Sequence, residues 1–133
     1  MTDIVHISSR DNPLLKELRK LAQDGAAYRK TGRIWIEGEH LCSAYLQRGG
    51  VLAIAVVLES KQALAQSNSA QAAPKLVVVA DALMAEISPL DSLAGIGFVC
   101  DLPANTALDP SASTVVLDRL QDPGNVGSIL RSA

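Results

Sequence analysis

The sequence predicts an α/β protein, and three observations support this prediction. Aliphatic and β-branched runs of strand length alternate with segments in which apolar residues recur at helical spacing. Glycine, proline and small polar residues separate the two kinds of segment. The 133 residues are 48% hydrophobic with a mean hydropathy of +0.19, which excludes a disordered chain and is enough for a layered core.

The first helix is predicted to begin at Pro13, with Asn12 as its cap, because proline lacks only an N–H that a first helical turn leaves unpaired. Leucines then recur at helical spacing until Gly25 ends the pattern. Residues 28–33 follow as a basic loop.

Four strands and three further helices are predicted after this loop. The strands cover residues 34–36, 51–58, 76–79 and 95–100, and the helices cover residues 39–47, 60–66 and 81–87. Ser60 and Asp81 are predicted to cap the second and third of these helices. The small and polar residues 67–74 are interpreted as a mobile surface loop.

The last third of the chain is predicted to be a linker, a strand and a helix. Residues 101–113 contain two prolines and little periodicity, which is typical of a semi-extended linker. Residues 114–117 have the composition of a buried strand, and the turn at residues 122–125 leads into a helix that Asn125 is expected to cap. The eight residues from Val126 are marginal as an isolated helix, so we expect them to fray or to dock elsewhere.

Positive charge is concentrated in the first third of the chain, although the whole chain has a net charge of −2. Residues 10–33 contain seven basic and three acidic side chains. Two interpretations stay open: a solvated helix face, or a patch that contacts nucleic-acid phosphates. The candidate phosphate contacts are Arg10, Lys16, Arg19, Lys20, Arg29, Lys30 and Arg33. Aromatic residues make up only 3% of the chain, which argues against a platform for stacking unpaired bases.

The turn near the C-terminus resembles a known catalytic motif. Leu117-Asp118, Asp122-Pro123-Gly124-Asn125-Val126-Gly127 and Arg131-Ser132-Ala133 together resemble the first signature motif of the SpoU (TrmH-type) RNA ribose 2′-O-methyltransferases of the SPOUT superfamily. The stretch from Ser9-Arg10-Asp11-Asn12-Pro13 to Ile36-Glu37-Gly38 is similar, more loosely, to the substrate-binding domain that precedes the catalytic domain in many of these enzymes.

The resemblance implies a domain organisation and a site. Residues 1–100 would be an RNA substrate-binding domain, a three-layer α/β/α sandwich like that of RNA-binding ribosomal proteins. Residues 101–113 would be the linker, and residues 114–133 would be the first β-α unit of a truncated knotted SPOUT domain. Asn125 and Arg131 would be catalytic, with Arg131 helping to activate the ribose hydroxyl.

The resemblance also implies a cofactor and partners. S-adenosyl-L-methionine would be bound by two further motifs expected downstream of Ala133, so we expect this chain to be an N-terminal piece that is inactive alone. The partner would be structured rRNA or tRNA, and the full-length enzyme would be a homodimer. No Gly-x-Gly-x-x-Gly offers another donor site.

Other classes of site are not expected. Cys42 and Cys100 lack disulfide or metal-ligand spacing and are interpreted as reduced, buried thiols, and neither His6 nor His40 has a ligand partner, so no metal is expected. No apolar run approaches the ~20 residues that span a bilayer, and no signal peptide is evident, which favours a cytoplasmic protein without membrane contact. Glu37 could hold an arginine of the basic loop, or could be a carboxylate favoured by the helix dipole.

Two competing functions stay open. The chain could be a structured-RNA-binding module without catalysis, or residues 123–127 could bind a small phosphate ligand at a helix N-terminus. The second alternative is weaker, because the turn lacks the lysine and the repeated glycines of phosphate-binding loops.

Overall fold

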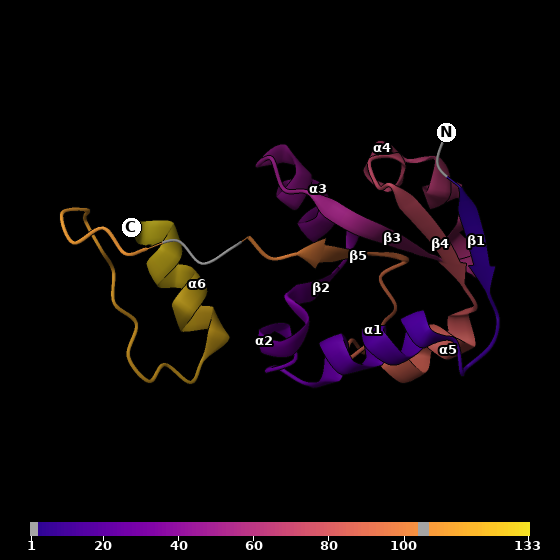
Figure 1. Ribbon diagram of the computed structural model, residues 1–133, viewed down its shortest axis with the longest axis horizontal. Helices are drawn as coiled ribbons and strands as arrows, with labels where there is room; N and C mark the ends of the chain where they lie inside the picture. The colour runs from indigo at the N-terminus through magenta and orange to yellow at the C-terminus, as the bar shows by residue number, and fades with distance from the viewer. Residues whose placement is uncertain (1–2, 104–106) are drawn as a thin grey trace. The chain divides into compact units, whose positions relative to one another are not determined.

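A computed structural model describes residues 3–103 and 107–133 and divides the chain into two compact units, Met1–Pro103 and Ala104–Ala133 (Figure 1). The two units are described separately. The boundary between the two units lies just after β5, the last strand of the first unit, which ends at Asp101.

The first unit is built on a five-stranded mixed sheet. Its strands are β1 (Ile4–Ile7), β2 (Arg33–Glu37), β3 (Leu52–Leu58), β4 (Lys75–Val79) and β5 (Ile96–Asp101), in the spatial order β1-β4-β3-β5-β2. β1, β4 and β3 run parallel, and β5 is antiparallel to both β3 and β2. The continuous aliphatic sequences of β3 and β4 fit this arrangement, because central strands are covered on both faces.

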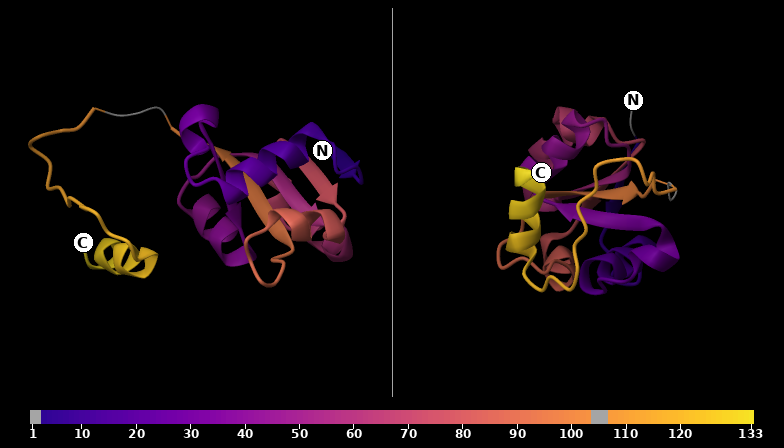
Figure 2. Two further views of the ribbon diagram at one scale, coloured as in Figure 1. Left: turned by 90° about the horizontal axis from the view of Figure 1, so that it is seen from below. Right: turned by 90° about the vertical axis from the view of Figure 1, so that its left-hand side faces the viewer.

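Helices cover both faces of the sheet, so the first unit has three layers with the sheet in the middle (Figures 1 and 2). One face packs against α1 (Pro13–Gln23) and α5 (Asp81–Ile87), where Leu15 and Leu18 are fully buried. The other face packs against α3 (Glu39–Gln47), the 3₁₀ helix η1 (Glu59–Gln66) and α4 (Asn68–Gln71). The three-layer α/β sandwich expected from the sequence is therefore confirmed.

The predictions for the first helix and for α3 are confirmed. The Asn12 side chain accepts a 2.9 Å hydrogen bond from the backbone N–H of Leu14, and Pro13 is the first residue of α1. Helix α3 has the same bounds as the predicted helix, residues 39–47. Cys42 and Cys100 are free thiols buried in the core, also as expected.

Three segments differ from the prediction because tertiary contacts override weak local signals. Ile4–Ile7, not predicted as a strand, forms β1 by pairing in parallel with β4. Residues 28–31 form a short helix, α2 (Tyr28–Thr31), at the start of the expected basic loop. The expected mobile loop contains the one-turn helix α4, whose Ala70 is fully buried, with Ser67 as its cap.

The two predicted helix caps at Ser60 and Asp81 are wrong. Neither η1 nor α5 has a side-chain cap of its own. Instead, the Asp81 carboxylate accepts a 3.1 Å hydrogen bond from the backbone N–H of Ser60 in η1. One carboxylate thus satisfies an N–H near the start of a neighbouring helix, and hydrogen bonds from the Ser60 side chain and then from its backbone lower the pKa of Asp81.

The second unit contains one helix, α6 (Pro123–Ser132), among its described residues. Asp122 caps this helix rather than Asn125, because Oδ1 of Asp122 accepts a 2.8 Å hydrogen bond from the N–H of Gly124. Residues 114–117 do not form the predicted strand, and Val116 is 82% exposed. An isolated β-branched segment has no strand to pair with in the described part of this unit, so its backbone groups stay open to solvent.

Within residues 3–103 and 107–133, no helix is both long enough and apolar enough to cross a membrane.

Candidate functional site

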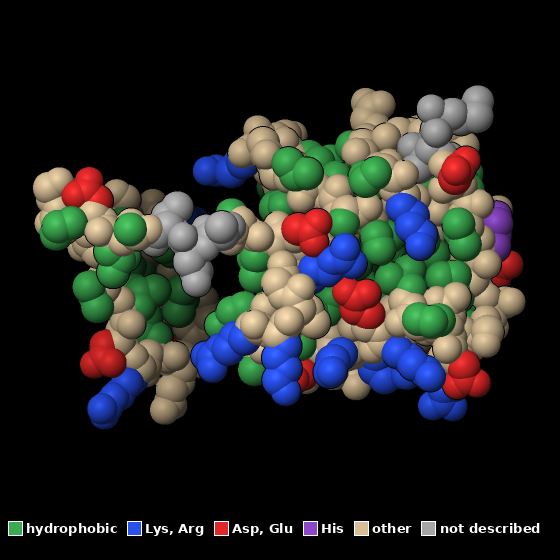
Figure 3. All heavy atoms as spheres, in the orientation of Figure 1, with side chains coloured by type: hydrophobic (Ala, Val, Ile, Leu, Met, Phe, Trp, Pro, Cys, Tyr) green, Lys and Arg blue, Asp and Glu red, His purple; other side chains and the backbone are tan. Residues whose placement is uncertain are grey.

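Helices α1 and α2 carry a surface of positive charge, which we call the basic surface and define as Lys16, Arg19, Lys20, Arg29 and Lys30. Figure 3 shows Lys and Arg side chains gathered along the edge of the first unit where these helices lie. Lys16 and Lys20 are exposed on the side of α1 away from the buried leucines, and Arg19 is half-buried at the edge of that side. They line a shallow open hollow together with Gln23 and Asp24.

The lysines of the basic surface are available for a ligand. Lys16, Lys20 and Lys30 are exposed, and none has an acidic partner within 4.0 Å in the described part of the chain. A phosphate could therefore pair with them without breaking an internal ion pair.

Arg10 and Arg19 both lie close to the carboxylate of Glu86 on α5. The Nε atom of Arg10 lies 3.1 Å from Oε2 of Glu86, and Nη2 of Arg19 lies 4.0 Å from the same oxygen. The Gln23 amide also donates to the backbone carbonyl of Glu86 at 3.0 Å. These contacts join α1 and the segment before it to α5, and Arg19, at 4.0 Å, is held more loosely by Glu86 than Arg10 is.

Arg33 is held inside the first unit. Its Nε donates a 2.9 Å hydrogen bond to Asp101 and its Nη1 donates at 3.3 Å to Glu17. Partial burial disfavours the charged guanidinium, but the hydrogen bond to Asp101 and the charge of Glu17 outweigh it and raise the pKa of Arg33. The sequence placed Arg33 with the phosphate contacts, whereas its observed partners are carboxylates of its own unit.

Tyr28 and Arg29 form a pair at the start of α2. The Arg29 guanidinium carbon lies 5.7 Å from the centre of the Tyr28 ring, and Arg29 Nε donates to the Tyr28 hydroxyl at 3.3 Å. Tyr28 is 42% exposed. The low aromatic content led the sequence interpretation to overlook this residue, although its place inside a basic segment was a usable signal.

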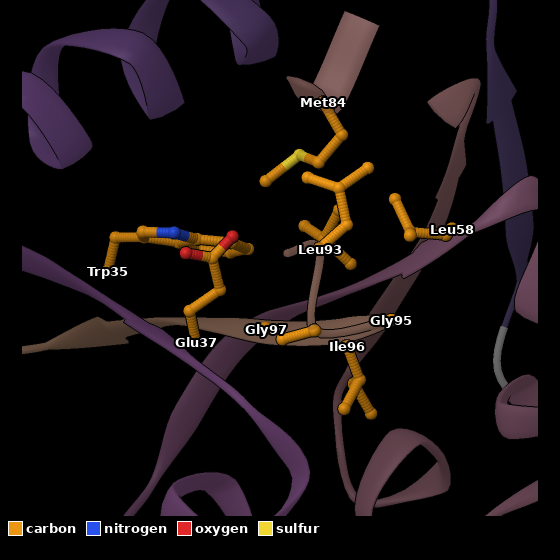
Figure 4. Close-up of a pocket in the computed structure, with 10 residues that line it drawn as sticks. Trp35, Glu37, Leu58, Met84, Leu93, Gly95, Ile96 and Gly97 are labelled. Atoms are coloured by element: carbon orange, nitrogen blue, oxygen red, sulfur yellow. The ribbon is translucent and has the colours of Figure 1, made fainter. Parts of the chain in front are cut away.

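Glu37 pairs with a serine, and no arginine among the described residues forms an ion pair with it. Its Oε2 accepts a 2.9 Å hydrogen bond from the Ser88 hydroxyl, which links the end of β2 to the residue after α5. Glu37 also lines a small pocket with Trp35, Met84 and Leu93, as Figure 4 shows. This pocket holds only about 10 Å³, roughly the room for one water molecule, so it is no substrate site.

The expected catalytic residues Asn125 and Arg131 both lie exposed on α6. Arg131 Nη2 donates to the Ser128 hydroxyl at 3.4 Å, and that hydroxyl donates to the Gly124 carbonyl at 3.0 Å. A Cβ placed on Gly127 would lie 3.6 Å from Arg131 Nη1, so the guanidinium lies back along the helix over Gly127.

Helix α6 does not by itself bring Asn125 and Arg131 together. At 100° and 1.5 Å per residue, the two positions differ by about 240° around the helix and about 9 Å along it. Their described hydrogen bonds stay within α6 and its cap. Other elements would be needed to complete a site around them.

The thiols and histidines offer no second chemistry. Burial raises the pKa of Cys42 to about 12, so the reactive thiolate form is disfavoured. His6 and His40 are both exposed. Among the described residues, no group of three His, Cys, Asp or Glu side chains is placed to hold a metal ion.

Curated proteins similar to this chain include RNA methyltransferases. An uncharacterized tRNA/rRNA methyltransferase of Synechocystis is 34% identical over 141 aligned positions, which cover 99% of this chain and 50% of the relative. The chain thus spans about half the length of the curated relatives it matches. No protein-family model matches it.

Solved structures agree with this comparison. The crystal structure of an RNA 2′-O ribose methyltransferase matches with a TM-score of 0.67 and 28% identity, over 98% of this chain and 51% of that one. The SpoU methyltransferase AviRb from Streptomyces viridochromogenes, solved with the cofactor AdoMet, matches with a TM-score of 0.65 and 19% identity, over 91% of this chain and 48% of that one. At 19% identity, the second likeness shows a shared fold. Taken with the motif at residues 117–133, these matches make the chain a relative of the SpoU/TrmH-type RNA methyltransferases and confirm the resemblance found in the sequence.

Proposed function

We propose that residues 1–133 are the RNA-recognition part and the first catalytic motif of an S-adenosyl-L-methionine-dependent RNA ribose 2′-O-methyltransferase. The observation that carries the proposal is the 28% identity to an RNA 2′-O ribose methyltransferase over 98% of this chain, which takes in both the sandwich and the motif helix. Structured rRNA or tRNA is the proposed substrate, in agreement with the tRNA/rRNA methyltransferase relative.

The basic surface supports the RNA part of the proposal. Five cationic side chains lie on two consecutive helices, and the three lysines have no internal acidic partner in the described chain. Lys and Arg neutralise backbone phosphates without reading sequence, so such a surface would position an RNA and leave the choice of nucleotide to other contacts. In the proposed role, Arg33 and Arg10 stabilise the fold beneath this surface.

The motif helix supports the catalytic part. A methyl transfer to a ribose hydroxyl requires a donor held in line with the oxygen and a group that helps the oxygen lose its proton. We assign the second task to Arg131, which is exposed and donates a 3.4 Å hydrogen bond to the Ser128 hydroxyl. S-adenosyl-L-methionine would supply the methyl group when bound. The described residues of the second unit hold one helix, so we assign donor binding to other parts of the assembled enzyme.

The proposal also includes an oligomeric state and a cellular location. We expect the active enzyme to be a homodimer that works in the cytoplasm, where mature tRNA and rRNA are found. We also expect residues 1–133 alone to bind RNA without transferring a methyl group, because we assign donor binding to other parts of the assembled enzyme.

Deleting the gene tests the proposed function directly. A 2′-O-methyl group protects the adjacent phosphodiester from alkaline hydrolysis, because the attacking hydroxyl is blocked. We expect rRNA or tRNA from the deletion strain to lose protection at one nucleotide, and the wild-type gene to restore it. The gene carrying Arg131→Ala serves as the matched control and should not restore it. Identical hydrolysis patterns with and without the gene would refute the methyltransferase proposal.

A second candidate function is binding of structured RNA without catalysis. The observation that favours it is that the sandwich has two hydrophobic cores of its own and carries the whole basic surface. Incubating the chain with isotopically labelled donor and RNA tests whether residues 1–133 transfer a methyl group by themselves. RNA binding without transfer fits both candidates, whereas transfer by the chain alone would contradict the division of labour proposed here.

A further inference from the structure

The aromatic residues of the first unit are distributed unevenly. Trp35 packs against one hydrophobic core, and Phe98 and Tyr45 belong to the other. Tyr28 belongs to neither core and is 42% exposed. An exposed tyrosine that does not serve the core is free to contact a ligand.

Tyr28 also has a planar cationic neighbour. The Arg29 guanidinium lies 5.7 Å from the ring centre, and its Nε donates to the Tyr28 hydroxyl at 3.3 Å. Nucleic-acid bases stack on aromatic rings and on guanidinium planes alike. The pair therefore offers two stacking surfaces that one hydrogen bond keeps together.

The backbone beneath the pair is well fixed. Ala27, just before Tyr28, is 2% exposed and anchors the start of α2. At the other end, Gly32 takes φ +66°, its N–H donates to the Tyr28 carbonyl at 2.9 Å, and its own carbonyl accepts from Leu102 at 2.8 Å. The Thr31 hydroxyl donates to the Ala27 carbonyl at 3.0 Å. A platform fixed in this way loses little conformational entropy when a base stacks on it.

We propose that Tyr28 and Arg29 form a stacking site for one unpaired nucleotide at the end of the basic surface. The inference rests on the proposed RNA function and narrows its substrate to RNA in which a loop or bulge base is exposed beside a helix. Figure 1 shows α2 beside the C-terminal end of α1. An RNA with its phosphates on the lysines of α1 would therefore extend toward Tyr28. A nucleotide offers a phosphate for the lysines and a flat base for the ring.

Two RNAs and three variants test this site. The RNAs are a hairpin with an unpaired loop and a blunt duplex with the sequence of the hairpin stem. The variants are Tyr28→Leu, Tyr28→Phe and, as a matched control, Leu41→Ser, which alters a residue of α3 that is 53% exposed on the other face of the sheet. Trp35 fluorescence and circular dichroism establish that each variant is folded.

We expect Tyr28→Leu to weaken hairpin binding on the order of tenfold and duplex binding less than about twofold, because the stacking ring is removed while no charge changes. Tyr28→Phe keeps the ring and loses only the hydroxyl that accepts from Arg29, so it should weaken hairpin binding much less than Tyr28→Leu does. Leu41→Ser should bind the hairpin as the wild type does, and the salt dependence should be the same in all four proteins. Equal weakening on both RNAs, or no weakening with Tyr28→Leu, would overturn the stacking site and leave the RNA function intact. A wild type that binds neither RNA would overturn both.

Discussion

Arg33 donates a 2.9 Å hydrogen bond from Nε to Oδ1 of Asp101, and the two residues are opposite one another in the register of β2 and β5. The same guanidinium reaches Glu17 on α1 through Nη1 at 3.3 Å. Arg33 therefore joins a helix to one end of the sheet, and its charge is already compensated before any RNA arrives.

Replacing Arg33 should reduce stability. We expect Arg33→Gln to lower the free energy of unfolding by roughly 0.5–1 kcal/mol, because two partly exposed ion pairs are removed. Urea unfolding followed by Trp35 fluorescence measures this change. Lys30→Gln is the control, since Lys30 is exposed and has no acidic partner among the described residues. Equal stability of the two variants would show that the Arg33 ion pairs contribute nothing to the fold.

Gly97→Ala should destabilise the first unit. A Cβ at Gly97 in β5 would collide with the Trp35 indole, which covers this strand position from β2. We expect a loss of about 1–3 kcal/mol, the usual cost of overpacking a core, together with a change in Trp35 emission. Gly25→Ala is the control, because nothing lies within 4 Å of a Cβ at that position. A Gly97→Ala protein as stable as Gly25→Ala would contradict the observed packing of Trp35 on β5.

Cys42 should make the fold sensitive to alkaline pH. Burial raises the pKa of Cys42 to about 12, above its value in the unfolded chain, so the native state holds the thiol proton more tightly. This contribution to stability is complete below about pH 9 and disappears as the pH rises toward about 12.

The measurement is the urea midpoint at about pH 8 and about pH 10.5. We expect Cys42→Ala to lose less stability between these values than the wild type does. A matched alkylation experiment at the lower pH should label Cys42 only after unfolding, because the native thiol is protonated and buried. Rapid labelling of the native protein would mean that the thiol is accessible.

Arg131→Ala should remove methyl transfer without removing donor binding. In an active enzyme that contains this segment, we expect the rate to fall by at least about a hundredfold, the scale for removal of a group that assists proton transfer. The dissociation constant of S-adenosyl-L-methionine, from calorimetry, should change little. Arg119→Ala is the control, because the Arg119 side chain is 93% exposed. A weaker donor affinity in Arg131→Ala would assign this residue to binding instead.

Local sequence signals predicted the helices and strands of the first unit well where they were strong, whereas its three-layer arrangement was expected from the family resemblance. The Asn12-Pro13 start, the bounds of α3 and the aliphatic strands β3 and β4 all combine favourable propensity with burial. The sequence could not predict β1, because a four-residue strand at a sheet edge depends on its pairing with β4. The Asp81–Ser60 hydrogen bond was missed for the same reason, since it joins two helices that only the fold brings together.

The candidate site, like the fold, could be predicted from the sequence only in part. Counting charges located the basic segment but could not separate Lys16 and Lys20, which are unpaired in the described chain, from Arg33, which is held by Glu17 and Asp101. The partners of an arginine depend on elements distant in sequence, and here they lie 16 and 68 residues away. The strand predicted at residues 114–117 followed from propensity alone, and the described unit offers it no pairing partner.

The most direct test of the account is a titration of the chain with structured RNA at several salt concentrations. We expect Lys16→Gln plus Lys20→Gln to weaken binding and to reduce the slope of log affinity against log salt by roughly 1.5–2, because each lysine is expected to neutralise one phosphate. The matched control is Lys61→Gln plus Lys75→Gln, which removes the same charge from η1 and β4 and should leave the slope unchanged. Equal slopes in the two double variants would contradict recognition of RNA by the basic surface.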